Sequence, residues 1–436
     1  MVSSETLKEI MVENREYILS IDKILPREID IPDVESLKRL KKAVVLYGVR
    51  RSGKSFILLH IFKKHPEKAF YIDFEDERLH DIEAKDLEKI WETILELKPE
   101  LIKSKDVILL FDEIQNVPMW EKFVRRLVEK KNAVAFCAGS SSKITPKEIH
   151  TSLRGRSWSI EVLPFSFKEF MNAKFNVEDV SEYLYGDRKV LVKGAFLEYV
   201  KYGGMPEVVL SKSEFEKRKM IKEYISSMYF RDMVERYRIS NIVLLDTLWN
   251  RLFTAYATKF SVNGFYRHYR NLIPISKDTL YEYYKHFIDS MLLFEVRKFT
   301  ESPYKRMRNP AKIYLVDHGL AKKISSENFG RILENIIYIE LRRRGYEVYY
   351  LEEEGRGCDF IAMKDDKVEA YQVSWELNEE NKDREIEGLL TASRIADTDE
   401  LFVLTYDQEG MIKNGGKEIK VIPAWKWLLR TTQGDR

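Results

Sequence analysis

The sequence predicts a multidomain α/β protein whose first part contains a parallel sheet covered by helices on both faces. Its 436 residues exceed what one ordinary hydrophobic core holds together, so several domains are expected. Up to about residue 165, short apolar runs alternate strictly with longer amphipathic stretches, as in parallel strands joined by helices. Beyond Pro164 the pattern becomes mostly helical, and beyond Pro310 strands and helices alternate again.

Each element of the first part is predicted from its hydrophobic pattern. Continuous apolar runs predict buried strands at Ala43–Tyr47, Ala69–Phe74, Val107–Phe111 and Ala133–Ala138. Apolar residues at helical spacing predict helices at Ser55–Lys64, Leu87–Leu97 and Trp120–Glu129.

The middle of the chain is predicted to be mostly helical from Phe165 to Tyr256, with a turn at Tyr202–Pro206. Helices at Gly264–Asn271 and Ser276–Met291 and a strand at Leu292–Val296 follow. This order of helix, turn, helix and strand is the outline of a winged helix.

The last part is predicted to be a second α/β region. Its expected strands are Lys312–Val316, Glu347–Leu351, Cys358–Met363, Glu369–Ser374 and Leu401–Leu404, and its expected helices are Ile332–Arg344 and Arg384–Ala396. We therefore predict four domains: an α/β core at 1–165, a helical lid or connector at 166–215, a winged helix at 216–305 and a final α/β domain at 306–436.

Composition argues against several classes of protein. Lysine and arginine (73) nearly balance aspartate and glutamate (71), so whole-chain charge does not by itself indicate a nucleic-acid partner. The first residues lack the apolar run of a signal peptide, and no later run is long enough to span a bilayer. Two distant cysteines, Cys137 and Cys358, fit a reducing compartment rather than a disulfide framework. We therefore expect a cytoplasmic protein without a membrane partner.

The segment VVLYGVRRSGKS contains the spacing G-x-x-x-x-G-K-S at Gly48, Gly53, Lys54 and Ser55. A predicted strand precedes it and a predicted helix follows, which is the context of a phosphate-binding P-loop. Backbone N–H groups and the helix N-terminus would hold the phosphates of ATP or ADP, Lys54 would reach the β- and γ-phosphates, and Ser55 would bind Mg²⁺. The residues predicted to contact the nucleotide are Gly48, Val49, Arg50, Arg51, Ser52, Gly53, Lys54, Ser55, Phe56 and Ser140.

The run VILLFDE is a buried strand that ends in Asp112 and Glu113, the arrangement known as Walker B. Asp112 is expected to hold Mg²⁺ through water, and Glu113 is expected to orient or deprotonate the attacking water. Two acids after an apolar strand are common, but their position after a P-loop indicates an ATPase site.

Two further positions are candidates for contact with the γ-phosphate. One strand ends in Ala138-Gly139-Ser140-Ser141-Ser142, where Ser140 would lie between the P-loop and the acidic pair, unless the segment is simply a serine-rich turn. In Leu153-Arg154-Gly155-Arg156, Arg156 is the preferred catalytic arginine, acting in cis or from a neighbouring subunit. A surface salt bridge is the alternative for that arginine.

With these motifs in place, the chain resembles the AAA-related P-loop ATPases that are expanded in archaea and some bacteria. The resemblance rests on GVRRSGKS, YIDFED (Tyr71–Asp76), LLFDEIQNVPMWE (Leu109–Glu121), AGSSS, LRGR, VLPFSFKEF (Val162–Phe170), YVKYGGMPEVV (Tyr199–Val209) and MYFRDMVERY (Met228–Tyr237). From about residue 305 the chain resembles the restriction-endonuclease-like domain, with a PD-(D/E)xK site, that often accompanies this family. These motifs are specific for ATP binding and much less so for any downstream activity.

In that nuclease fold, a helix glutamate, a strand aspartate and an E-x-K pair gather Mg²⁺ for phosphodiester hydrolysis. The resemblance places Glu334 and Asp359 at the first two positions, but Gln372 and Ser374 stand where the glutamate and lysine belong. With one carboxylate fewer, metal should bind weakly, so we expect a degenerate domain that holds DNA or has no catalytic role. Compensation by Glu340 or Glu369, with residual cleavage, is the alternative.

A basic stretch follows the predicted recognition helix Ser276–Met291, and Glu301 is the one acidic residue in that stretch. Its basic residues are Arg297, Lys298, Lys305, Arg306, Arg308 and Lys312. The stretch is either a wing that contacts the backbone of double-stranded DNA or a solvated connector. Two functions follow: an ATPase that acts on or with DNA, or a nucleotide-gated switch that binds a protein partner or forms a homo-oligomer.

Overall fold

The computed structural model describes residues 2–101, 106–140, 144, 149, 151–177, 181–300, 302–321 and 328–430, with only the backbone at 140, 181, 303, 305 and 307. The chain divides into two compact units, Met1–Leu163 and Pro164–Arg436, and each has its own sheet. Within the described residues, no helix is both long enough and apolar enough to cross a membrane.

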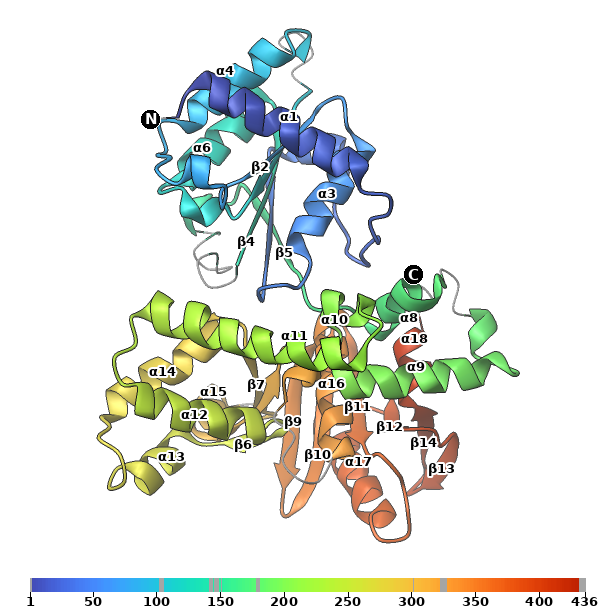
Figure 1. The fold of residues 1–436 in the computed structure, drawn as a ribbon. Coiled ribbons are helices and arrows are strands. Elements are labelled where there is room, and N and C mark those ends of the chain that lie inside the picture. Colours follow the sequence, from blue (N-terminus) through green and yellow to red (C-terminus); the bar gives the residue numbers. More distant parts are fainter. Residues whose placement is uncertain are drawn as a thin grey trace. The chain divides into compact units, whose positions relative to one another are not determined.

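The described residues of the N-terminal unit form a five-stranded parallel sheet (Figure 1). Its strands are β1 (Ala43–Gly48), β2 (Ala69–Asp73), β3 (Ile108–Asp112), β4 (Val134–Ser140) and β5 (Ser157–Glu161). They lie in the order β2-β3-β4-β1-β5, and every neighbouring pair is parallel. The predicted parallel core is therefore confirmed, although the partly exposed edge strand β5 was not predicted because it lacks an apolar run.

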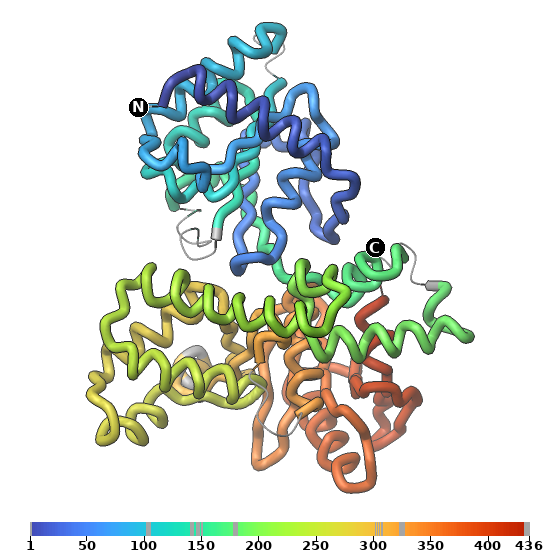
Figure 2. The backbone as a smooth tube through the Cα atoms, viewed as in Figure 1, coloured from blue at the N-terminus to red at the C-terminus, as the bar shows by residue number. Residues whose placement is uncertain are grey.

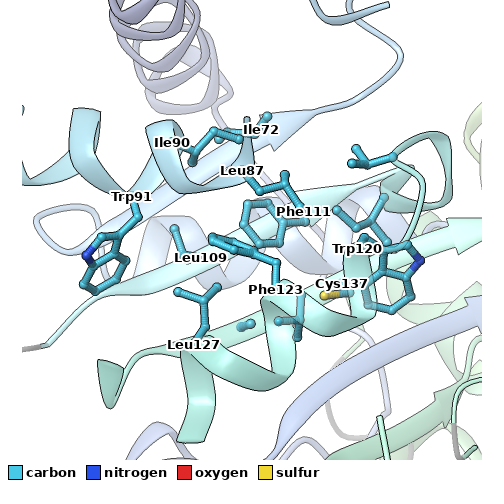
Figure 3. Packing of buried hydrophobic residues seen from close by; sticks show 14 of the residues in the cluster. Ile72, Leu87, Ile90, Trp91, Leu109, Phe111, Trp120, Phe123, Leu127 and Cys137 are labelled. Atoms are coloured by element: carbon cyan, nitrogen blue, oxygen red, sulfur yellow. The ribbon is translucent and has the colours of Figure 1, made fainter. Parts of the chain in front are cut away.

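Helices cover both faces of this sheet, because successive strand residues point to opposite sides. The helices are α1 (Ser4–Ser20), α2 (Val34–Leu40), α3 (Lys54–Lys64), α4 (Leu87–Leu97) and α6 (Trp120–Arg126), which continues as a π-helical turn at Leu127–Lys131. One core joins α1, α4 and α6 to residues such as Leu109 and Phe111, and the other joins α2 and α3 to Ile108 and Leu110. Figure 3 shows the first core, where the rings of Phe111 and Phe123 lie 6.4 Å apart between centroids. Figure 2 shows the backbone of α1 lying beside that of α4.

The C-terminal unit begins with a run of helices, as predicted. These are α8 (Phe167–Phe175), α9 (Arg188–Tyr202), α10 (Pro206–Leu210), α11 (Glu214–Ser227) with its π-helical continuation Met228–Glu235, and α12 (Ile242–Thr254). The predicted turn is present, because Gly203 has a φ of 83° and a Cβ there would lie 2.0 Å from Asp317 Oδ1. The Asp317 carboxylate also accepts a 2.7 Å hydrogen bond from the Gly204 N–H.

Further elements of this unit build a nine-stranded sheet within the described residues. The strands are β6 (Thr258–Phe260), β7 (Leu293–Lys298), β8 (Ala311–Leu315), β9 (Glu347–Glu353), β10 (Arg356–Lys364), β11 (Lys367–Val373), β12 (Leu401–Thr405), β13 (Gly410–Asn414) and β14 (Lys417–Pro423). The helices are α13 (Val262–Tyr269), α14 (Lys277–Asp289), α15 (Pro303–Arg308), α16 (Phe329–Arg343), α17 (Lys382–Ala396) and α18 (Ala424–Leu429). Figure 1 shows α16 and α17 beside β9, β10 and β11.

One parallel pairing makes this sheet continuous. β7 pairs with β9 at Arg297↔Tyr349 and Lys298↔Tyr350, which joins the group β6-β8-β7 to the strands that follow. The same sheet therefore runs across residue 305, where we predicted a domain boundary. The finer division into 166–215, 216–305 and 306–436 stays a prediction.

Candidate functional site

The P-loop and the acidic pair lie at the same edge of the N-terminal sheet. Gly48 ends β1 opposite Ser140, which ends β4, and Asp112 ends the next strand, β3. Because the three strands are parallel and adjacent, their carboxyl ends meet at one edge, where ligands bind in open α/β sheets. The order β3-β4-β1 also places the end of β4 between the P-loop and the acids.

Two glycines shape the P-loop. A Cβ at Gly48 would lie 2.2 Å from the Val162 carbonyl oxygen, so only glycine allows this approach of β1 to the segment after β5. Gly53 has a φ of 95°, a left-handed conformation that favours glycine, and it precedes the first residue of α3. That first residue, Lys54, is 5% exposed, and its Nζ donates to the carbonyls of Gly48 (3.1 Å) and Val49 (3.0 Å). The ammonium is thus held at the loop that would cradle phosphates.

The remaining predicted loop residues differ in exposure. Arg51 has a φ of 65° and is exposed, Arg50 is half-buried, and Ser52 is buried. Phe56, in the first turn of α3, is 53% exposed.

Ser55 and Asp112 meet below the P-loop. The Ser55 hydroxyl hydrogen-bonds the Asp112 carboxylate, whose Oδ2 also accepts a 2.9 Å bond from the Tyr71 hydroxyl. Burial raises the pKa of Asp112, and the bonds from Ser55 and Tyr71 oppose that rise. Ser55 and Asp112 thus offer a hydroxyl and a carboxylate oxygen that face each other, and Mg²⁺ prefers such oxygen ligands. These residues therefore fit the ion that the P-loop implies. Tyr71 was not predicted to take part.

Glu113 is held by a residue that the sequence analysis missed. Its backbone is left-handed, with a φ of 47°, and the Gln115 amide nitrogen donates to its carboxylate. The Gln115 Oε1 is buried and has no hydrogen-bond partner among the described residues. A Cβ at Gly139, near the end of β4, would lie 2.0 Å from this oxygen. The glycine therefore makes room for the glutamine that positions Glu113.

Two more missed residues border the site. Arg27 donates from its guanidinium to the Ser52 carbonyl (2.7 Å) and to the Leu163 carbonyl (2.7 Å), which fastens the segment before α2 onto the P-loop. Asp73 ends β2 directly opposite Asp112. Burial, together with repulsion from nearby carboxylates, raises the pKa of Asp73 to about 6. The sequence signals neither contact, because both depend on strand order and chain path.

The two γ-phosphate candidates have different outcomes. The Ser140 backbone ends β4 at the P-loop edge, but its side chain, and all of Ser141 and Ser142, lie outside the described residues. Arg156 precedes β5, whose first residue pairs with Ala43 at the amino end of β1, so it lies at the opposite end of the sheet from the P-loop. Its Nε donates to Glu129 Oε1 at 2.9 Å. This placement contradicts a role for Arg156 in cis, and contact from a neighbouring subunit stays a prediction.

The four residues assigned to the nuclease-like site come together in the C-terminal unit. They line a cavity of about 440 Å³: Glu334 from α16, Asp359 from β10, Gln372 from β11 and Ser374 just after β11. The two proposed substitutes lie elsewhere, because Glu340 pairs with Arg343 and Arg344, and the buried Glu369 accepts from Tyr371. Neither lines this cavity.

Several residues of this pocket were not predicted to belong to it. Lys312 of β8 contacts both Glu334 Oε1 and Asp359 Oδ1 at 2.9 Å. The Gln372 amide nitrogen donates to Glu385 of α17, whose carboxylate also contacts Arg384. Among the described residues, no group of three or more histidine, cysteine, aspartate or glutamate side chains is arranged to hold a metal ion.

Several residues of the basic stretch are engaged within the protein, which leaves fewer of them for contact with DNA phosphates than the sequence indicates. Lys312 is half-buried and is paired with two acids of the pocket, Glu334 and Asp359, so its assignment to a DNA-facing wing is wrong. Arg297 pairs with Glu295, and Lys298 pairs with Glu353 at 3.4 Å. Arg306 donates to the Thr300 carbonyl. Arg308 is exposed, and the Lys305 side chain lies outside the described residues.

Known proteins share this chain's sequence features. Residues 40–171 match an AAA domain, and residues 193–328 match a domain of unknown function, DUF8612. The chain is 38% identical over 441 residues to uncharacterized protein MJ1544 of Methanocaldococcus jannaschii, covering 97% of this chain and 95% of that protein. It is 29% identical over 428 residues to an uncharacterized protein of Haemophilus influenzae, covering 95% and 99%. The solved Walker-type ATPase PABY2304 of Pyrococcus abyssi is 17% identical and covers 69% of this chain and 98% of its own, with a TM-score of 0.45.

Proposed function

Because this chain belongs to the family of uncharacterized protein MJ1544 and carries an AAA domain, we propose that it binds Mg·ATP and hydrolyses it to ADP and phosphate. The observation that carries this proposal is the convergence of Lys54, Ser55, Asp112 and Glu113 at one edge of the parallel sheet. P-loop ATPases use the same residue types to hold phosphate, bind the metal and direct water.

The residues divide the reaction among them. The Lys54 ammonium exchanges its P-loop carbonyl partners for the β- and γ-phosphate oxygens of ATP. Ser55 and Asp112 would hold Mg²⁺, which when bound neutralises phosphate charge. Glu113 accepts a proton from the water that attacks the γ-phosphorus, the bond to the β-phosphate oxygen breaks, and ADP leaves.

Nucleotide binding tests the first half of this proposal. Lys54→Ala should weaken Mg·ATP binding by at least about tenfold, since it removes the ammonium that the motif places on the loop. Lys64→Ala, which changes an exposed lysine of the same helix, is the matched control and should bind normally. Equal affinities of the two variants, measured by calorimetry, would show that the loop does not hold the phosphates.

We further propose that the C-terminal unit acts on or with double-stranded DNA through a winged helix and a degenerate nuclease-like domain. The order α12, β6, α13, α14, β7, β8, with β6 and β7 both antiparallel to β8, supports the winged helix. Exposed Lys277 and Lys285 of α14, with Arg308, supply charges for phosphate contacts. The order α16, β9, β10, β11, α17, β12 supports the nuclease-like region.

A nucleotide-gated switch that binds a protein partner or another copy of the chain is the second candidate. The internal pairing of Arg297, Lys298 and Lys312 favours it, because these charges are not free for phosphate. ATP hydrolysis measured with and without duplex DNA over a range of salt separates the two. DNA stimulation of ATP hydrolysis that disappears at high salt supports the DNA function. An ATPase rate that does not respond to DNA, together with a nucleotide-dependent change in oligomeric state, supports the switch.

A further inference from the structure

Lys312 projects from β8 between the two acids that the nuclease resemblance assigns to metal binding. Its Nζ lies 2.9 Å from Glu334 Oε1 and 2.9 Å from Asp359 Oδ1. The side chains of these three residues are only 16%, 11% and 15% exposed. Water therefore screens the two ion pairs poorly, and the lysine bridges the carboxylates as a shared counter-charge.

A lysine side chain is ordinarily an ammonium at neutral pH, so Lys312 brings a positive charge to within hydrogen-bond distance of both acids.

Several oxygens of this pocket also accept hydrogen bonds from other donors. Glu334 Oε1 accepts a second bond from the Tyr314 hydroxyl at 2.6 Å. Asp359 Oδ2 accepts from the Val373 N–H at 3.1 Å, and Gln372 Oε1 accepts from the Asp359 N–H at 3.1 Å. Mg²⁺ and Mn²⁺ require several such oxygens in a near-ideal shell. With Lys312 in place, the residues present do not fit a divalent ion, because its ammonium faces Glu334 Oε1 and Asp359 Oδ1 while Asp359 Oδ2 and Gln372 Oε1 face backbone N–H donors.

Charge leads to the same result. A divalent ion between Glu334 and Asp359 would lie beside the Lys312 ammonium and would be repelled by it in a poorly screened pocket. Gln372, where the nuclease pattern has a carboxylate, brings no negative charge, and the Glu385 carboxylate of the same pocket is paired with Arg384.

We propose that Lys312 is a built-in cation that takes the place of the divalent metal, so that the C-terminal pocket is a metal-independent, internally charge-paired site. It follows that this pocket does not activate water for phosphodiester cleavage, whatever the unit binds. The inference is independent of ATP hydrolysis, because it concerns only residues of the C-terminal unit.

Manganese binding by the full chain tests this assignment. Every variant carries Asp112→Asn, so that the P-loop edge contributes no metal site, and free Mn²⁺ is titrated by electron paramagnetic resonance without nucleotide. The parent should show no Mn²⁺ site that depends on Asp359. Lys312→Ala should create one site at least tenfold tighter than any in the parent, and adding Asp359→Asn should remove it. Lys298→Ala, which removes another ion-paired lysine of the same sheet, should create none.

Two results would overturn the proposal. The first is an Asp359-dependent Mn²⁺ site, or Mg²⁺-dependent DNA cleavage lost in Asp359→Ala, in protein that retains Lys312. The second is a folded Lys312 variant, verified by its melting transition, that gains no Mn²⁺ site. Lys312→Gln serves beside Lys312→Ala, since it removes the charge but keeps a polar side chain if the alanine variant unfolds.

Discussion

Gln115 and Gly139 show how single residues set the position of the Glu113 carboxylate. The Gln115 amide donates to Glu113, and it fits only because residue 139 lacks a side chain: a Cβ there would lie 2.0 Å from Gln115 Oε1. The sequence indicates Glu113 as the candidate base. It does not indicate that Gln115 positions Glu113, because this arrangement depends on the packing of Gly139 in β4 against the turn after β3. A general base acts only at the correct distance from its water, so this support matters for the rate of hydrolysis.

Gly139→Ala should therefore slow ATP hydrolysis more than it weakens ATP binding. The new methyl group would displace Gln115 and release Glu113, and we expect kcat to fall by roughly tenfold, equivalent to about 1.4 kcal/mol. Gly194→Ala, at a helical glycine with no atom within 4 Å of the added Cβ, is the control and should hydrolyse normally. Steady-state kinetics with separately measured ATP affinity checks this, and an unchanged kcat in Gly139→Ala would show that Gln115 does not position the base.

Asp73 gives a prediction about pH. Its folded-state pKa of about 6 lies above the ordinary value of 3.8, so the ionised side chain destabilises the fold at neutral pH, and this cost diminishes as the pH falls through 6. Asp73→Asn should accordingly stabilise the nucleotide-free protein at pH 7.5. Without solvent screening, this pKa shift corresponds to about 3 kcal/mol of unfolding free energy. Because Asp73 is only partly buried, screening reduces the expected increase in unfolding free energy to about 1 kcal/mol.

Denaturant unfolding of Asp73→Asn and wild type at pH 7.5 and 4.5 measures that difference. The gain should be clearly smaller at pH 4.5, where the folded aspartate is protonated. A gain that is equal at both pH values would mean that the effect does not come from ionisation of Asp73.

At the scale of elements, long apolar segments were predictable and short or edge segments were not. Helix Leu87–Leu97 has the predicted bounds, and the P-loop flanks differ from prediction by about one residue, because buried strands and amphipathic helices carry strong periodicity. Edge strands such as β5 and β13 are exposed on much of their length and carry no such pattern. Helix α1 was missed because only one side of its largely polar sequence is buried.

The segment between α1 and α2 offers an element-scale prediction. Arg27 fastens this segment to the carbonyls of Ser52 and Leu163, both at 2.7 Å. Arg27→Ala removes two charge-assisted hydrogen bonds, so the N-terminal unit should lose about 2 kcal/mol of unfolding free energy and bind ATP several-fold more weakly. Arg39→Ala, at an exposed position of α2, is the control. Thermal unfolding with and without Mg·ATP measures both effects. Equal unfolding temperatures of the two variants under both conditions would contradict a role for the Arg27 hydrogen bonds.

For the whole molecule, the sequence predicts which chemistry belongs to each part but not which strands are neighbours. The P-loop and Asp112 meet because β4 lies between β1 and β3, and the continuous sheet of the C-terminal unit arises from the pairing of β7 with β9. Lys312 enters the nuclease-like pocket for the same reason: its strand lies beside β7, far in sequence from Asp359. A basic residue in a basic stretch gives no sign that it pairs with acids of a pocket, so the prediction that Lys312 faces DNA was wrong.

We propose that Glu113 serves as the base for hydrolysis of ATP held by the P-loop. Single-turnover release of phosphate from Mg·ATP by wild type and Glu113→Gln, with ATP affinity measured on the same samples, tests it most directly. We expect Glu113→Gln to bind ATP as tightly as wild type but to release phosphate at least about a hundredfold more slowly, because the variant lacks the general base. Phosphate release at the wild-type rate would contradict the assignment of Glu113 and would move the search for the base to other residues of this edge.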